Sequence, residues 1–231
     1  MNITCDLIAQ MTDLSAVKAN DGKAEMAQLI ATAQEFGCFL VSALPAHTRT
    51  LLQRLGPDRK IKVSGNVGFP SGGQTCSIKV AETRELLQLG VDEIDMVINI
   101  GELLSGHEGT VREEIRSVVD EACGLPVKVI LECCYLSEAQ ILRSCDLCIE
   151  AKASFIKTST GWAAVGATVD HVAFIKKHSG GAIGIKASGG IRDMETVMNL
   201  LQAGADRLGI GMRSFPPIMR EIRAREAHRI E

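Results

Sequence analysis

Residues 137–161 read SEAQILRSCDLCIEAKASFIKTSTG, and this stretch contains the repeating unit from which the fold can be predicted. Its first seventeen residues have the apolar spacing of an amphipathic helix. The short run Phe155-Ile156-Lys157 follows, and a polar turn ends at Gly161. A helix that leads into a short apolar strand is typical of a parallel sheet, in which helices connect neighbouring strands.

The same unit recurs along the chain. Short apolar runs that predict strands lie near residues 39, 61, 94, 127, 154, 183 and 207, and amphipathic stretches separate them. An eighth strand is expected at Cys5–Ala9, whereas residues 12–22 (TDLSAVKANDG) have the composition of a loop or of the approach to a helix. No G-x-G-x-x-G turn follows an early strand. The pattern therefore predicts an α/β fold, a single (β/α)8 TIM barrel with parallel strands, rather than a doubly wound sheet.

Length and composition narrow the range of functions. A chain of 231 residues suits one barrel domain over residues 1–231, of which residues 1–20 are the hardest to interpret. The net charge of −3, with acidic and basic residues interspersed, predicts no attraction to nucleic acid or to an anionic membrane. No segment approaches eighteen uninterrupted apolar residues, and no basic leader precedes an apolar run. These features favour a cytoplasmic protein.

The eight cysteines contain one C-x-x-C spacing, at Cys145 and Cys148. Because this pair falls in a predicted helix, we interpret both residues as small buried hydrophobic side chains rather than as metal ligands. The other cysteines are scattered, which fits a reducing compartment. The histidines fall mostly in helices or their approaches, without a carboxylate or cysteine set that would complete a metal site. We therefore expect no metal.

Two lysines are the candidates for chemistry. Lys157 stands at the end of an apolar strand in FIKTSTG, and Lys186 has the same setting in GIKASGG. Catalytic groups of a parallel barrel come from the carboxyl ends of its strands, and these two strands are consecutive. Each ammonium should make protonation of the other less favourable, so that at least one lysine has a lowered pKa. A neutral lysine can condense with an aldehyde or ketone to form a Schiff base.

Asp95, inside the apolar strand EIDMVINIG, is the candidate proton carrier. A structural ion pair of Asp95 with either lysine would explain the same residues equally well. Asn66 and Glu132 also end strands, and we interpret both as hydrogen-bonding residues of the barrel interior in preference to substrate contacts.

The remaining candidates are polar or glycine residues in the turns that follow the last three predicted strands. Backbone N–H groups of such turns can bind a phosphate, although glycine turns also simply connect strands to helices. The predicted substrate-binding residues are Thr158, Ser159, Gly161, Ser188, Gly189, Gly190, Gly211 and Arg213.

The segments EIDMVINIG, KVILE, FIKTSTG, GATVDHV and GIKASGGIR, in this order and spacing, resemble the deoxyribose-phosphate aldolase family of class I aldolases, over roughly Ile61 to Gly211. The resemblance implies a TIM barrel, a Schiff base on Lys157, tuning and proton transfer by Lys186, and a proton-relay role for Asp95. It implies reversible cleavage of 2-deoxy-D-ribose 5-phosphate to acetaldehyde and D-glyceraldehyde 3-phosphate. It implies no cofactor, and it favours a homo-oligomer.

The chain departs from the family pattern at four places. Residues 41–45 read VSALP where members usually have a V-C-V-N-P type segment, and Trp162 follows the TSTG turn. The usual R-I-G-T-S-S turn, whose serines hold phosphate, is replaced by residues 207–213, RLGIGMR, in which Arg213 could supply charge. Asp6 or Asp13 could stand in for an early acidic motif. An aldolase of the same mechanism with another aldehyde or ketone substrate, and a non-catalytic sugar-phosphate-binding barrel, are the alternatives.

Overall fold

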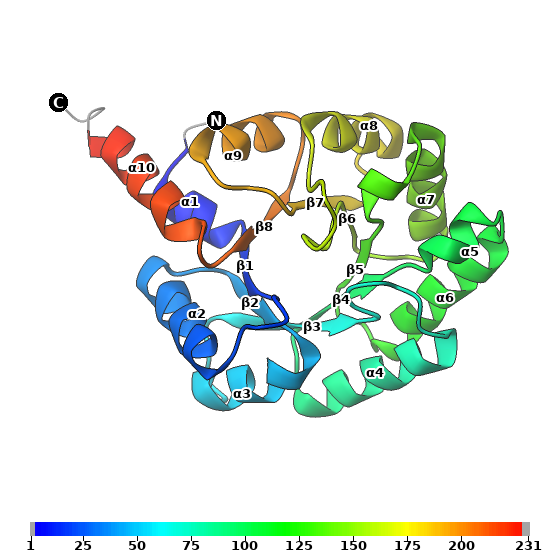
Figure 1. Cartoon of the computed structure of the whole chain (residues 1–231), viewed down its shortest axis with the longest axis horizontal. Coiled ribbons are helices and arrows are strands. Elements are labelled where there is room, and N and C mark those ends of the chain that lie inside the picture. Colours follow the sequence, from blue (N-terminus) through cyan, green and yellow to red (C-terminus); the bar gives the residue numbers. More distant parts are fainter. Residues whose placement is uncertain (1–2, 228–231) are drawn as a thin grey trace.

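Eight parallel strands close into a barrel in sequence order, and helices surround it in this computed structural model, which describes residues 3–227 (Figure 1). The strands are β1 (Thr12–Ala16), β2 (Leu40–Ala43), β3 (Lys62–Val67), β4 (Glu93–Val97), β5 (Val127–Ile130), β6 (Phe155–Lys157), β7 (Gly184–Ser188) and β8 (Arg207–Gly211). The barrel closes between β1 and β8, where Asp13 pairs with Gly209. The predicted (β/α)8 barrel is confirmed, and β2 to β8 lie where the sequence predicts strands.

Helices connect the strands and cover the outside of the barrel (Figure 1). They are α1 (Cys5–Gln10), α2 (Lys23–Phe36), α3 (Pro45–Leu55), α4 (Cys76–Leu89), α5 (Ile100–Leu104), α6 (Glu108–Glu121), the 3-10 turn η1 (Cys133–Tyr135), α7 (Glu138–Glu150), α8 (Val169–Ser179), α9 (Met194–Gln202) and α10 (Phe215–Ala227). Among residues 3–227, no helix is both long and apolar enough to cross a bilayer.

The prediction for the N-terminal segment is wrong. Cys5–Gln10 is the helix α1, and the first strand is Thr12–Ala16, inside the stretch that the sequence analysis assigned to a loop. Thr4 explains the helix, because its side chain accepts a hydrogen bond from the Leu7 N–H and caps the first turn. Thr12 and Asp13 are buried despite being polar, so β1 lacks the apolar run by which the other strands are recognised.

The alternation of side chains along the strands determines what fills the barrel. In β4, Ile94 and Met96 are fully buried against the surrounding helices, and the intervening Asp95 points into the interior. Strand register then aligns Asp95 with Lys128 of β5, and Lys157 of β6 with Lys186 of β7. The interior near the middle of the barrel is consequently built from charged side chains, which require one another as partners.

The cysteines of α7 belong to the apolar layer. Cys145 and Cys148 are buried within the hydrophobic core, as is Cys133 of η1. Burial raises the pKa of the Cys145 thiol to about 12, so this thiol stays protonated at neutral pH. The interpretation of the C-x-x-C pair as small buried hydrophobic side chains is confirmed.

Candidate active site

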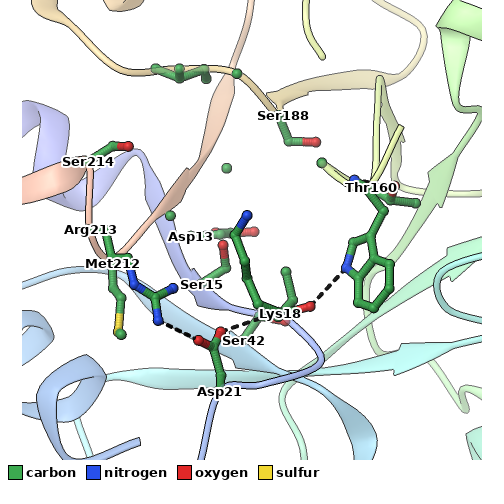
Figure 2. A pocket seen from close by; sticks show the side chains of 18 of the residues that line it. Asp13, Ser15, Lys18, Asp21, Ser42, Thr160, Ser188, Met212, Arg213 and Ser214 are labelled. Atoms are coloured by element: carbon green, nitrogen blue, oxygen red, sulfur yellow. Dashed lines mark hydrogen bonds and ion pairs between the residues drawn. The ribbon is translucent and has the colours of Figure 1, made fainter. Parts of the chain in front are cut away.

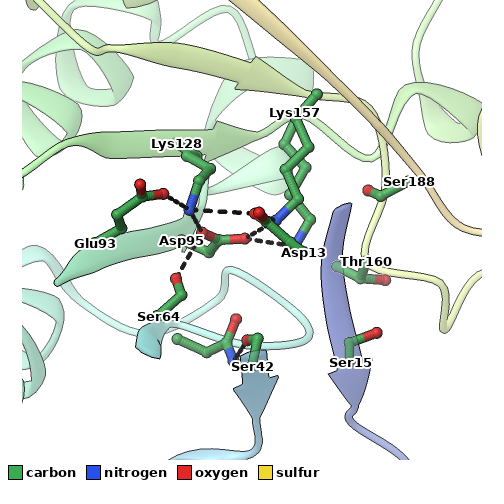
Figure 3. Close-up of polar contacts among 12 residues, drawn as sticks. Asp13, Ser15, Ser42, Ser64, Glu93, Asp95, Lys128, Lys157, Thr160 and Ser188 are labelled. Atoms are coloured by element: carbon green, nitrogen blue, oxygen red, sulfur yellow. Dashed lines mark hydrogen bonds and ion pairs between the residues drawn. The ribbon is translucent and has the colours of Figure 1, made fainter. Parts of the chain in front are cut away.

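Asp95 is the hub of the polar interior (Figure 3). Its Oδ2 accepts hydrogen bonds from the Nζ atoms of Lys157 and Lys186, each at 2.8 Å. Its Oδ1 accepts hydrogen bonds from Lys128 Nζ at 2.6 Å and from Ser64 Oγ at 2.8 Å. Burial by itself would raise the pKa of Asp95, but the lysines outweigh it and hold this pKa well below its usual range. Asp95 is therefore a carboxylate at neutral pH.

A second group of ion pairs lies deeper and surrounds Lys128. Lys128 Nζ is 2.6 Å from Glu93 and 3.5 Å from Asp13, besides its contact with Asp95. Arg207 pairs with Asp13 and with Glu93, at 3.1 Å in each case. Burial disfavours a charged Lys128, yet these carboxylates together raise its pKa above the ordinary value. Lys128 is thus a permanent cation.

The charges of this ion cluster do not balance when every group is ionised. Three carboxylates face four basic side chains: Asp13, Glu93 and Asp95, against Lys128, Lys157, Lys186 and Arg207. One cation is in excess. The pKa of Lys157 is lowered to about 8, first by burial and then by the charge of Lys186, whereas Asp95 opposes the change. Deprotonation of Lys157 removes the excess charge and gives a neutral amine, the form that attacks carbonyl groups.

The structure brings together the three side chains predicted to be catalytic. Lys157, Lys186 and Asp95 are all buried, and both lysines contact the same carboxylate oxygen. The sequence analysis attributes the lowered pKa to repulsion between the lysines. That repulsion is present, but burial is the larger cause.

A pocket of about 400 Å³ opens above this cluster (Figure 2). Lys157, Lys186 and Asp13 line it from the barrel interior. Its walls include most of the predicted turn residues, namely Gly161, Ser188, Gly189, Gly190, Gly211 and Arg213. The amine of Lys157 is therefore reachable by a small molecule that enters from the carboxyl ends of the strands.

Thr158 and Ser159 are not among the residues that line the pocket. Thr158 Oγ1 donates a hydrogen bond to the Ser188 carbonyl at 3.2 Å and accepts one from the Ser188 N–H at 3.1 Å. Ser188 Oγ donates to the Ser159 carbonyl at 2.5 Å. These contacts join the turn after β6 to the end of β7, so that Lys157 and Lys186 are held at a fixed separation.

The two glycines after β7 are needed where they stand. Gly189 and Gly190 have φ angles of +84° and +75°, which side chains rarely adopt. The loop after β6 also passes directly over them, since a Cβ on Gly166 would lie 2.2 Å from the Gly189 carbonyl. This close approach shapes the wall of the pocket beside Lys186.

Arg213 lies at the rim, half exposed, and its guanidinium is already engaged. Its Nη2 is 2.7 Å from Asp21 Oδ1, and the Asp21 side chain is fully buried. The positive charge that the sequence assigned to substrate binding is therefore paired with a carboxylate of this chain.

Asn66 and Glu132 are hydrogen-bonding residues of the interior, as expected, and neither lines the pocket. Asn66 Nδ2 donates to Ser42 Oγ at 3.0 Å and to the Ala43 carbonyl at 2.7 Å. Glu132 accepts hydrogen bonds from the Thr160 N–H at 3.2 Å and from the Thr160 hydroxyl. Burial raises the pKa of Glu132. Glu132 thus holds the turn that follows Lys157.

Trp162 ties three loops together at the mouth of the pocket. Its indole N–H donates to the Val17 carbonyl at 2.8 Å, and its ring meets the Phe69 ring edge-on with 6.3 Å between centroids. The loops after β1, β3 and β6 are joined by these two contacts. Trp162 remains 47% exposed and lines the pocket, so part of it is accessible to solvent and to molecules that enter.

The sequence analysis did not identify three residues that belong to the site. Lys128 carried a usable signal, because a lysine inside the apolar strand PVKVI has the same setting as Lys157. Asp13 was considered only as a substitute for an early acidic motif, since its strand was not recognised. Lys18 lines the pocket from an exposed loop, and nothing in its local sequence distinguishes it from any surface lysine.

Comparison with known proteins agrees with this geometry. Residues 7–214 match the model of the DeoC/LacD family aldolases. The chain is 43% identical over 225 residues to a deoxyribose-phosphate aldolase of Klebsiella pneumoniae. This alignment covers 96% of this chain and 90% of the relative. It superimposes on the aldolase QR15 with a TM-score of 0.88 at 36% identity, over 95% of this chain and 97% of the other.

A third similarity is to a deoxyribose phosphate aldolase from Aeropyrum pernix, described as having a unique tetrameric structure. The TM-score is 0.85 and the identity 26%, and the match covers 96% of this chain and 93% of that one. The family match, which extends from α1 to the turn after β8, includes every strand of the barrel and the whole ion cluster. The chain belongs to the DeoC/LacD family of aldolases.

Proposed function

We propose that this aldolase cleaves 2-deoxy-D-ribose 5-phosphate reversibly to acetaldehyde and D-glyceraldehyde 3-phosphate through a Schiff base on Lys157. The observation that carries the proposal is the amine of Lys157, which is buried, has a pKa of about 8, and borders a pocket open to small molecules. At pH 7 about one-tenth of such an amine is neutral, against less than about one-thousandth for an ordinary lysine.

In the cleavage direction, Lys157 Nζ adds to the aldehyde carbon of the open-chain sugar and water leaves, which produces a protonated imine. A base removes the proton of the C3 hydroxyl, C3 becomes the carbonyl carbon of glyceraldehyde 3-phosphate, and the C2–C3 bond breaks. Its electron pair moves toward the imine nitrogen and forms an enamine. Protonation of C2 and hydrolysis then release acetaldehyde and restore the amine.

Asp95 and Lys186 are suited to move the protons in this sequence. Asp95 Oδ2 lies 2.8 Å from the reacting nitrogen, Lys157 Nζ, and 2.8 Å from Lys186 Nζ. A proton can therefore pass between the two amines through Asp95. The positive imine nitrogen takes the place of the ammonium of Lys157, so Asp95 can stabilise the intermediate as it stabilises the protonated lysine. Lys186 lowers the pKa of Lys157, which favours the free amine before the substrate binds.

Trapping of the intermediate tests the proposal. The protein is incubated with acetaldehyde, reduced with borohydride and digested, and the modified lysine is identified by mass spectrometry. The expected adduct is on Lys157, and it is absent from the Lys157→Met variant but present in the Lys177→Met variant, which removes an exposed lysine of α8. Lack of any adduct on Lys157 in the unmodified protein would favour a non-catalytic sugar-phosphate-binding barrel.

The turn after β8 favours a second candidate with the same mechanism. Gly211 and Met212 occupy the positions at which family members usually have hydroxyl groups for phosphate, so an aldol without a phosphate is the alternative substrate. Rates of cleavage of 2-deoxyribose 5-phosphate and of 2-deoxyribose separate the two candidates. A clear preference for the phosphorylated sugar supports the first, and equal rates support the second.

The protein is further proposed to act in the cytoplasm as a homo-oligomer. All eight cysteines are free, which suits a reducing compartment. Several large apolar side chains are exposed, among them Ile78, Leu104 and Tyr135, and such residues are common where subunits meet. Light scattering of the purified protein gives the oligomeric state, and a monomer at micromolar concentration would contradict this part of the proposal.

A further inference from the structure

The loop between β1 and α2 forms one side of the pocket mouth, and Asp21 fixes its shape. Asp21 Oδ2 accepts a hydrogen bond from the Lys18 N–H at 2.8 Å, while Oδ1 binds Arg213 at 2.7 Å. The Asp21 carbonyl is 3.0 Å from His47 Nε2. The backbone of Lys18 is therefore attached to the turn after β8 through one buried carboxylate.

Lys18 extends from this loop into the pocket mouth, between the turns that contain Ser188 and Ser214 (Figure 2). Its ammonium has no carboxylate within ion-pair distance among residues 3–227, unlike those of Lys157 and Lys186. The backbone of Lys18 is fixed, whereas its charge is free to meet a ligand.

The turn after β8, which lies beside this loop, supplies little free charge of its own. Gly211 has no side chain, Met212 is 1% exposed, and the guanidinium of Arg213 is taken by Asp21. Arg192, on the loop after β7, also lines the pocket and has no ion-pair partner in the described part of the chain. Figure 2 labels Lys18 and Arg213, and of these two it is Lys18 that extends into the mouth, whereas Arg213 is bonded to Asp21.

We infer that Lys18 binds the anionic far end of the substrate, a phosphomonoester, and so replaces the serine hydroxyls missing from the turn after β8. The inference rests on the proposed function, because it assigns a recognition role within the same pocket. An ammonium is a compact charge that binds a phosphate dianion without requiring a fixed planar geometry. Gly189 and Gly190 of the turn after β7 also line the pocket, and backbone N–H groups of such a turn can complete the coordination. Lys18 thus determines specificity without contacting the atoms that react.

The test compares kcat/KM for 2-deoxyribose 5-phosphate with kcat/KM for 2-deoxyribose in the unmodified protein, Lys18→Met and Lys18→Arg. Loss of one charge-assisted contact lowers the ratio of the two constants roughly 10- to 100-fold in Lys18→Met. Lys18→Arg, which keeps the charge, recovers most of the ratio. Lys23→Met is the matched control, because Lys23 is exposed at the start of α2, only five positions further along, and does not line the pocket.

Inorganic phosphate gives an independent measurement. It should inhibit cleavage of unphosphorylated 2-deoxyribose competitively, and the inhibition constant should rise about tenfold or more in Lys18→Met. Increasing ionic strength should weaken the inhibition in the unmodified protein, because the contact lies at an open rim.

The outcomes separate the inference from the proposed function. Trapping of acetaldehyde on Lys157 of the unmodified protein tests the proposed function alone, because acetaldehyde carries no anionic group. If the adduct forms but the ratio and the inhibition by phosphate are the same in Lys18→Met as in Lys23→Met, the inference is wrong. A substrate ratio near one in the unmodified protein also overturns it. Circular dichroism and thermal melting of each variant establish that the fold is retained.

Discussion

Lys128 and Lys157 occupy neighbouring strands, are both buried and share the carboxylate of Asp95. Their pKa values are nevertheless shifted in opposite directions from that of an ordinary lysine. The pKa of Lys128 is raised, whereas that of Lys157 is lowered to about 8. Burial acts on both lysines in the same sense, and it disfavours the charged form of each. The difference must therefore come from the partners.

Lys128 has three carboxylates within 3.5 Å, whereas Lys157 has one and lies beside a second lysine that shares it. A desolvated lysine surrounded by carboxylates stabilises the fold as a permanent ion. A desolvated lysine that shares its only carboxylate is a reactive amine. Lys128 is thus a structural lysine and Lys157 a reactive one, and the number of neighbouring carboxylates distinguishes them.

Replacement of Lys157 by Met should have the largest effect of any substitution on activity. Without an amine at this position no imine forms, so cleavage should fall below detection, a loss of at least about 10⁴-fold. Stability should not fall, because the substitution removes a buried group for which the charged form is unfavourable. Steady-state kinetics and thermal melting measure the two effects. A marked decrease in melting temperature would show that Lys157 is also structural.

Replacement of Lys128 by Met should give the opposite result for stability. Glu93 and Asp95, both buried, lose their shared cation, which should cost about 3–5 kcal/mol of unfolding free energy. Urea denaturation measures the loss, with Lys177→Met as a surface control. If Lys128→Met were as stable as this control, the carboxylates would not depend on Lys128.

Replacement of Lys186 by Leu should shift a pH profile. Removal of its charge raises the pKa of Lys157 for two reasons. The repulsion between the two ammonium groups disappears, and Lys157 no longer shares Asp95 Oδ2 with Lys186. Adduct formation with acetaldehyde should then require a higher pH than in the unmodified protein. Lys186→Arg keeps the charge and should keep the profile near that of the unmodified protein. Identical profiles for the Leu and Arg variants would exclude a role for the charge.

The smallest expected effect concerns stability at alkaline pH. The folded pKa of Lys157, about 8, lies below the ordinary value of 10.5 that applies to the unfolded chain. Between these values the unfolded chain binds more protons, so the free energy of unfolding gains a contribution as the pH rises from about 8 toward 10.5. This contribution is lost as the pH falls through 8. Denaturation of the unmodified protein and of Lys157→Met across this range isolates it, because the variant lacks the group.

The sequence was sufficient for most of the barrel, because β2 to β8 are apolar runs between amphipathic helices. It was also sufficient to identify Lys157, Lys186 and Asp95 as candidates, since a charged residue near the end of a buried strand is conspicuous. β1 was misplaced for the converse reason. Its residues are polar and become buried only because ion pairs form across the closed barrel, and Asp13 has its partners on β5, β7 and β8.

The distinction between Lys128 and Lys157 also required the structure. Both are lysines in apolar strands, and the local sequence does not show how many carboxylates from other strands surround each of them. Lys18 illustrates a further limit, because its position at the pocket mouth depends on the attachment of its loop to Asp21 and, through Arg213, to the opposite end of the chain. Contacts between residues distant in sequence decide each case.

Trp162 is the only tryptophan of the chain, and it lines the pocket while remaining about half exposed. The emission of an indole depends on the polarity and hydration around it, so the protein contains its own optical reporter at the place where a ligand would enter. Rapid mixing with a sugar phosphate can therefore follow occupancy of the mouth in real time, without a label. Imine formation on Lys157, deeper in the barrel, can be timed separately by quenching with borohydride.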